Sequence, residues 1–130
     1  MSEKSYVGYR TMQKGHEGDA VNAGCNVDVI NRDGTRHPLN PHYDVRNHSP
    51  CGFEWGYQGS GPAQLALALC LDATQDRRRA EYVYQAFKRA VVCRLPRDGW
   101  ILLFDYVLSQ IEIIEGAELV GELPDQAGEE

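Results

Sequence analysis

The segment from Gly59 to Pro62 is the strongest candidate for a site that binds a charged ligand. Its sequence, GSGP, precedes a long apolar run, so we expect it to form the first turn of a helix. Backbone N–H groups gather at such a helix N-terminus, where the helix dipole favours an anion. Gly59, Ser60 and Gly61 are therefore the predicted anion-binding residues, with a phosphate or nucleotide as ligand. The turn lacks the lysine and spacing of a P-loop, and glycines here also let a strand turn sharply into a close-packed helix.

Reactive side chains stand just before this turn, at His48, Ser49, Cys51 and Glu54. A cysteine nucleophile needs a base at about 3 Å and a third group that orients the base. Residues so close in sequence rarely align in that way. A metal site built from His42, His48, Cys51 and Glu54 would match no known zinc-ligand spacing. We therefore predict no catalytic residue and no metal site. We expect His48 and Ser49 to hydrogen-bond the backbone of the turn.

Seven of the thirteen basic residues fall in the window from Arg77 to Arg97. Such a stripe could contact nucleic-acid phosphates. Acidic residues dilute it at Asp76, Glu81 and Asp98, and it comes with no helix-turn-helix or zinc-finger pattern. We therefore do not expect direct binding of nucleic acid. Pairing between this stripe and the acidic residues that follow would neutralise both features.

The C-terminal third of the chain is strongly acidic. From Asp98 to Glu130 there are 9 acidic residues and no basic one, whereas the preceding part holds 13 basic and 10 acidic residues. One interpretation is a solvated helix face followed by a frayed tail. The other is an acidic surface that occupies a basic, nucleic-acid-binding groove of a protein partner. In that case the contact residues would be Asp105, Glu112, Glu115 and Glu118.

Composition places the chain among ordinary globular domains. Its 130 residues are 42% hydrophobic and 25% charged, which fits one domain. The four cysteines form no C-x-x-C pair, and the polar N-terminal segment does not resemble a secretory signal, so we expect reduced thiols and a cytoplasmic protein. No apolar run approaches the roughly 20 residues of a membrane-spanning helix. We find no cofactor motif.

The first half of the chain predicts a small antiparallel sheet. We expect short strands at residues 5–10, 26–30, 42–47 and 53–57, with a hairpin turn at 31–35. Phe53, Trp55 and Tyr57 alternate, so a strand would place their rings on one face, against which the helices would pack. The glycine-rich segment from Met12 to Asn26 is expected to be a mobile loop.

The second half predicts two or three helices. Residues 63–71 are apolar except for Gln64, which is typical of a buried helix; Gly61 or Ser60 would cap it, and Gln64 would reach back to the cap. A second, amphipathic helix would follow a cap at Thr74 or Asp76. After a brief extension at 100–102, a third helix would run over 103–114 and stop at Gly116, with a strand at 110–114 as the alternative. Residues 121–130 are expected to be a disordered acidic tail.

Strands that precede helices indicate an α+β fold, here a small antiparallel sheet in the N-terminal half packed against two to three C-terminal helices, within one domain over residues 1–120. The run GFEWGYQGSGPAQLALALCLD at 52–72, with LPRDGW at 95–100, resembles an uncharacterised prokaryotic, phage and plasmid family with a GFEWGY-x-GSGPAQLALALL-like signature. The resemblance covers roughly residues 6–111, with 12–26 as an insertion. It implies a single α+β domain, often on mobile genetic elements, and brings no catalytic residues.

These observations favour a non-enzymatic binding protein. On a mobile genetic element, the most specific form of this function is an anti-CRISPR or other anti-defence inhibitor. It would engage a basic surface of a nucleic-acid-handling complex through the acidic C-terminal third. The alternative is a small phosphate- or nucleotide-binding protein or enzyme that uses the GSGP turn.

Overall fold

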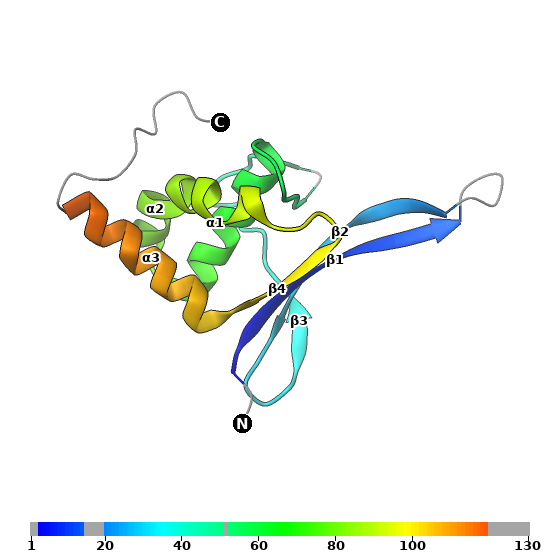
Figure 1. The fold of residues 1–130 in the computed structure, drawn as a ribbon, viewed down its shortest axis with the longest axis horizontal. Helices are drawn as coiled ribbons and strands as arrows, with labels where there is room; N and C mark the ends of the chain where they lie inside the picture. The colour runs from blue at the N-terminus through cyan, green and yellow to red at the C-terminus, as the bar shows by residue number, and fades with distance from the viewer. Residues whose placement is uncertain (1–2, 15–19, 51, 120–130) are drawn as a thin grey trace.

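The computed structural model describes residues 3–14, 20–50 and 52–119, and this part of the chain has the predicted α+β architecture. It holds a four-stranded sheet, three α-helices and one short 3-10 helix. In chain order these are β1 (Ser5–Lys14), β2 (Ala20–Ile30), β3 (Arg36–Pro38), α1 (Ser60–Thr74), α2 (Arg77–Ala90), η1 (Val92–Arg94), β4 (Gly99–Leu103) and α3 (Phe104–Leu119). The helices gather beside one end of the sheet, and the β1–β2 hairpin extends away from them (Figure 1).

The sheet has the order β3-β2-β1-β4 and is antiparallel throughout. The predicted strands at 5–10 and 26–30 are confirmed as parts of β1 and β2. The predicted turn is confirmed too: the Asn31 N–H donates to the Thr35 carbonyl at 2.8 Å, and Gly34 takes the positive φ of 91° that such a turn requires. The fourth strand, β4, comes from the short segment between α2 and α3, and it pairs with β1.

The prediction of a loop over 12–26 is wrong for the described residues of that segment. β1 and β2 continue as paired strands, from Thr11 opposite Gly24 to Lys14 opposite Ala20. The register shifts between Thr11 and Met12, and Gly24 accommodates the irregularity with a φ of 152°. Backbone pairing therefore continues along both strands beyond the irregularity.

The segment 53–57 is not a strand, which corrects the prediction that its three rings share one face. Trp55 is fully buried, Phe53 is partly buried and Tyr57 is exposed. Gly56 interrupts the extended backbone with a φ of 88°, and its N–H donates to the Val92 carbonyl at 3.1 Å. The segment therefore lies against η1 rather than in the sheet.

The predicted strand at 42–47 is also wrong. His42 adopts a left-handed conformation with a φ of 60°, and its carbonyl accepts hydrogen bonds from the N–H groups of Val45 and Arg46. These contacts form a turn, and a left-handed residue does not fit the extended backbone of a strand.

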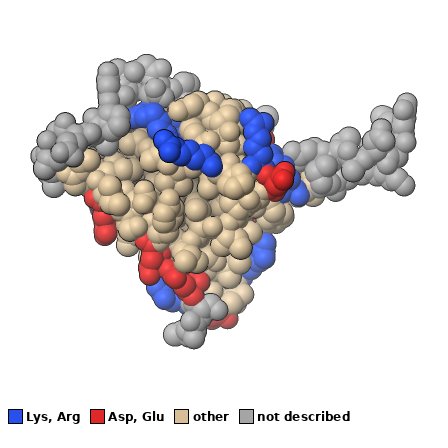
Figure 2. Space-filling view, viewed as in Figure 1, with Lys and Arg blue, Asp and Glu red and all other residues tan. Residues whose placement is uncertain are grey.

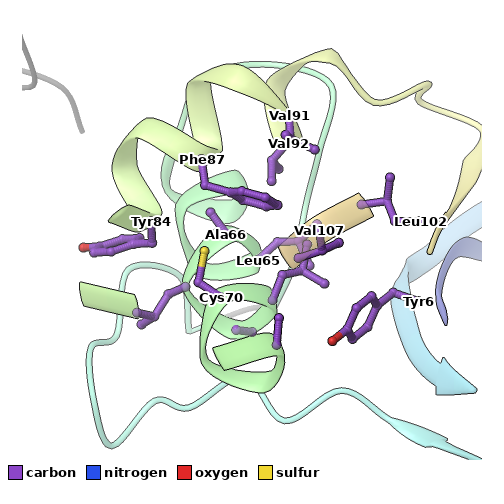
Figure 3. Packing of buried hydrophobic residues seen from close by; sticks show 14 of the residues in the cluster. Tyr6, Leu65, Ala66, Cys70, Tyr84, Phe87, Val91, Val92, Leu102 and Val107 are labelled. Carbon is purple, nitrogen blue, oxygen red and sulfur yellow. The ribbon is translucent and has the colours of Figure 1, made fainter. Parts of the chain in front are cut away.

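Helix α1 lies at the centre of the core. Its side chains are buried on nearly every side between α2, α3 and the sheet, as the all-apolar sequence predicts (Figure 3). The sheet contributes the face that carries Tyr6, Val29 and Leu102, and this is the face the helices cover. Tyr6 is fully buried, and its hydroxyl donates to a carboxylate oxygen of Asp72 at 2.6 Å, which satisfies the polar end of the ring.

The other two helices follow the predicted spacing. Asp76 is the N-cap of α2 and accepts a hydrogen bond from the Arg79 N–H at 3.2 Å. In α3, buried residues recur at Val107, Ile111 and Ile114, so the strand alternative at 110–114 is wrong. Gly116 does not end this helix, which continues to Leu119. The predicted tail at 121–130 lies outside the described residues, and among the described helices we find none that could cross a membrane.

Candidate functional site

The GSGP turn forms the start of α1, and the helix begins earlier than expected, with Gly59 at the cap position. Among the described residues no side chain caps this end. A methyl group at Gly61 would lie 2.6 Å from the Glu54 Cβ atom, and one at Gly59 would lie 2.8 Å from the Tyr57 ring. The glycines thus allow close packing, which favours the packing interpretation of this turn. Anion binding by Gly59, Ser60 and Gly61 stays a prediction.

Gln64 does not reach back to the helix cap, which corrects the predicted capping interaction. It is fully buried and holds the preceding loop through four hydrogen bonds. Its amide nitrogen donates to the carbonyls of Pro41, at 2.7 Å, and Arg46, at 3.0 Å. Its amide oxygen accepts from the N–H groups of His48, at 2.7 Å, and Ser49, at 3.2 Å. One side chain therefore fixes the loop that leads to the GSGP turn.

A polar cluster of Arg10, Cys25 and Glu54 joins β1 and β2 to the same turn. Arg10 donates to both carboxylate oxygens of Glu54 at 3.1 Å and to the Cys25 Sγ atom at 2.6 Å. The Cys25 thiol donates to Glu54 at 3.1 Å. The Arg10 guanidinium also lies over the Trp55 ring, 4.9 Å from its centroid, and the Arg97 carbonyl accepts from both Arg10 Nε and Trp55 Nε1. All of these polar groups are engaged within the chain.

The electrostatics of the cluster do not suit nucleophilic chemistry. Burial, together with the hydrogen bond to Glu54, raises the pKa of Cys25 to about 11, so the thiol is protonated at neutral pH. Burial by itself would raise the pKa of Glu54. Hydrogen bonds from Arg10, Cys25 and the Trp55 N–H outweigh that effect and lower this pKa, so Glu54 is an ionised partner of Arg10.

The predicted reactive residues before the turn are drawn to different partners. The ring Nε2 of His48 lies 2.7 Å from the Tyr84 hydroxyl on α2, and Glu54 faces Arg10. Cys51 lies outside the described residues. The backbone N–H groups of His48 and Ser49 donate to the Gln64 amide oxygen, which holds both residues through their backbone. In the described ranges no three potential metal ligands gather.

The basic stripe does not form one surface. Arg77 pairs with Glu81 at 2.7 Å, and Arg79 binds Glu115 of α3 through two hydrogen bonds of 2.8 and 2.9 Å. Lys88 is almost fully buried. The sequence offered two uses for this stripe, contact with nucleic acid or pairing with the acidic residues that follow it. The pairing is confirmed at Arg79 and Glu115.

The predicted acidic contact residues divide into different environments. Asp105 and Glu112 are exposed and two helical turns apart, so they lie on one side of α3. Glu115 is half-buried by its pairing with Arg79, and the side chain of Glu118 lies outside the described residues. Acidic side chains follow the course of α3 in the view of Figure 2. Asp105 and Glu112 are therefore the described acids still available to a partner.

Large exposed apolar side chains accompany these acids. All the exposed isoleucines and leucines of the described chain lie on β4 and α3: Ile101 is 67% exposed, Leu103 48% and Ile113 62%. Tyr106, also on α3, is 44% exposed and lines a 310 Å³ hollow with the β4 residues. Ile113 borders a second hollow, of 360 Å³, between α2 and α3. The outer side of β4 and α3 is thus both acidic and apolar.

The fold defines a small α+β protein whose outer helix, α3, carries exposed acidic and apolar side chains. The chain belongs to a family of unknown function, DUF6166, whose model matches residues 6–113. The search of curated proteins and the search of solved structures found no match. The family assignment confirms the resemblance to an uncharacterised family and leaves the function to be inferred from the molecule itself.

Sequence reasoning missed two features of the site. The partnership of Arg10 and Cys25 with Glu54 depends on the register of β1 and β2, which places Arg10 opposite Cys25. The buried role of Gln64 did leave a signal, because Gln64 is the one polar residue in the apolar run 63–71. A lone amide there must find hydrogen-bond partners in the core.

Proposed function

We propose that the protein is a non-enzymatic binding protein that engages a basic surface of a protein partner through the outer side of α3. The observation that carries this proposal is the pair of parallel stripes on that helix. Asp105 and Glu112 form an acidic stripe, and Tyr106 and Ile113 form an exposed apolar one beside it, each pair seven residues apart.

This combination suits a protein interface. Exposed tyrosine and isoleucine side chains offer apolar surface that a partner can desolvate, and the acids steer and orient a basic partner. Within the described chain neither Asp105 nor Glu112 takes part in an ion pair. Arg79 neutralises Glu115 internally, so among the described side chains the acidic contact set is Asp105 and Glu112.

The partner class follows from the same chemistry. Proteins that hold nucleic acid present basic grooves, so an acidic helix can compete for such a groove. We therefore propose a nucleic-acid-handling complex in the cytoplasm as the partner, and an anti-defence inhibitor of a mobile genetic element, such as an anti-CRISPR protein, as the most specific form of this function.

The experiment is a tagged pull-down from host lysate at low and high salt, followed by affinity measurement on the captured partner. Glu112→Lys should weaken binding at least tenfold, and the wild-type affinity should fall as salt rises. Asp44→Lys is the matched control, because it changes the charge equally at an exposed position in the 42–47 turn. Equal affinity of the Glu112 variant and wild type would contradict the proposal.

The alternative of phosphate or nucleotide binding at Gly59–Gly61 has its own readout. A nucleotide that binds the folded protein raises its melting temperature by mass action. If nucleotide raised the melting temperature and the pull-down captured no protein partner, the results would favour nucleotide binding at Gly59–Gly61.

A further inference from the structure

The 360 Å³ hollow lies between the C-terminal halves of α2 and α3, which pack against each other (Figure 1). Small side chains on both helices leave this space open, at Ala86 and Ala90 on α2 and at Ala117 on α3. Ile113 and Ile114 complete its apolar lining, and two arginines, Arg89 and Arg94, also line it. The hollow is therefore an apolar depression beside two positive charges.

The charge at this hollow is available to a negatively charged group. Arg94 is exposed, and within the described chain it forms no ion pair. An occupant that suits the hollow combines an apolar side chain, which the alanines and isoleucines can bury, with acids that face the arginines.

The chain continues beyond α3 with a segment of this chemistry. Residues 120–130, which lie outside the described part, have the sequence VGELPDQAGEE, with four acidic residues and no basic one. The expected disorder of residues 121–130 follows from their polar composition, and Leu123 is the exception in it. Gly121 and Pro124 are residues that favour the end of a helix and a change of chain direction.

The segment also begins close enough to reach the hollow. α3 ends at Leu119, two residues beyond Ala117. Ile114 lies five residues before that end, a distance of about 8 Å at about 1.5 Å per residue. Three residues of extended chain span about 10 Å, so Leu123 reaches the hollow if the chain reverses at Gly121.

We propose that residues 120–125 fold back from the end of α3 and fill the hollow of the same chain. Leu123 buries its side chain against the alanines, and the acids on either side of it, Glu122 and Asp125, lie beside the two arginines. Asp105, Tyr106 and Glu112 do not line the hollow, so the docked segment leaves these partner-contact residues uncovered. The docked segment and the partner surface meet at Ile113.

The test is NMR on the full chain, with backbone order parameters and the methyl resonances of Ala90 and Ala117 as readouts. We expect the amides of residues 120–123 to approach the order parameter of about 0.85 of rigid backbone. Leu123→Asp should lower these values below about 0.6 and shift both methyl resonances, because an apolar hollow does not accept a carboxylate. Ala127→Asp adds the same charge to the same tail and is the matched control that should change neither readout. Unchanged resonances of the sheet show that both variants fold.

A charge reversal tests the arginines separately. Arg94→Glu should lower the order parameters of residues 120–123, whereas Arg32→Glu, an exposed change in the hairpin turn, should leave them as in wild type. If these order parameters did not change in Arg94→Glu, the role assigned to the arginines would be overturned.

Three results would overturn the docking itself. One is a wild-type chain whose order parameters at 120–123 lie below about 0.6. Another is a Leu123→Asp chain with unchanged methyl resonances at Ala90 and Ala117. The third is a dependence of those resonances on protein concentration, which would place the segment of a second copy in the hollow.

Discussion

Two regions of the molecule treat their polar side chains differently. Near the start of α1, the side chains of Arg10, Glu54 and Gln64 form hydrogen bonds within the chain. On α3, the acids Asp105 and Glu112 have no ion-pair partner among the described residues. The first region fully buries Gln64 and partly buries Arg10 and Glu54, and burial of a polar group costs free energy unless a partner satisfies it. The second leaves both charge and apolar surface in water. The contrast separates groups that maintain the fold from groups that are available for binding.

The largest expected effect in the first region is at Gln64. Gln64→Leu removes four hydrogen bonds and leaves two partly buried N–H groups, of His48 and Ser49, without their acceptor. We expect the free energy of unfolding to fall by about 3 kcal/mol, because an unsatisfied buried group costs about 1–3 kcal/mol. Urea denaturation measures this, and Gln58→Leu, at an exposed position, is the control. If both variants lost the same free energy of unfolding, Gln64 would have no special role in holding the loop.

The next largest loss of stability is expected from a substitution at Gly61. Gly61→Ala brings a methyl group against the Glu54 Cβ atom and should lower the free energy of unfolding by about 1–3 kcal/mol. Gly116→Ala is the matched change on α3, where an added methyl group meets nothing within 4 Å. That variant should gain about 0.5–1 kcal/mol through its better helix propensity. Thermal melts of both variants test the pair, and a stabilised Gly61→Ala protein would contradict close packing at the turn.

The helices and the α+β class could be predicted because their signals are local. The apolar run of α1, the spacing of Val83, Tyr84 and Phe87 in α2, and the cap at Asp76 each depend on neighbouring residues alone. Position within the sheet is not local. The backbone conformations of Gly52 and Gly56, with φ values of 104° and 88°, override the alternation of 53–57, and alternation alone does not reveal this.

The candidate site was less predictable, for a similar reason. The acidic excess of the C-terminal third was visible in the sequence, but the loss of Glu115 from the surface depends on where α2 places Arg79. Exposure of Ile101 likewise depends on how β4 joins the sheet, because its pairing with β1 turns Leu102 toward the helices and Ile101 toward the other face. Such contacts link residues far apart in the chain, so composition and spacing do not show them.

A smaller effect, dependent on pH, is expected at Glu54. Its pKa is lowered in the folded protein, so its ionised form stabilises the fold above the unfolded pKa of about 4.3, and this contribution is lost as pH falls through the folded pKa. Glu54→Gln should cost about 1 kcal/mol at pH 7, since the side chain is 34% exposed and partly screened. The deficit relative to wild type should shrink toward pH 3. Denaturant titrations at both pH values measure it, and a deficit that is equal at pH 7 and pH 3 would remove the assigned role of the Arg10 pairing.

The smallest effect on stability, and the sharpest test of the comparison, lies on α3. Ile113→Lys replaces a side chain that is 62% exposed, so the free energy of unfolding should change by less than about 0.5 kcal/mol. The same substitution places a positive charge one position from Glu112, so affinity for a basic partner should fall several-fold. Denaturation and partner titration on one protein preparation give both values. A large loss of stability would mean that this surface belongs to the fold after all, because a side chain available for binding can change without disturbing the packing beneath it.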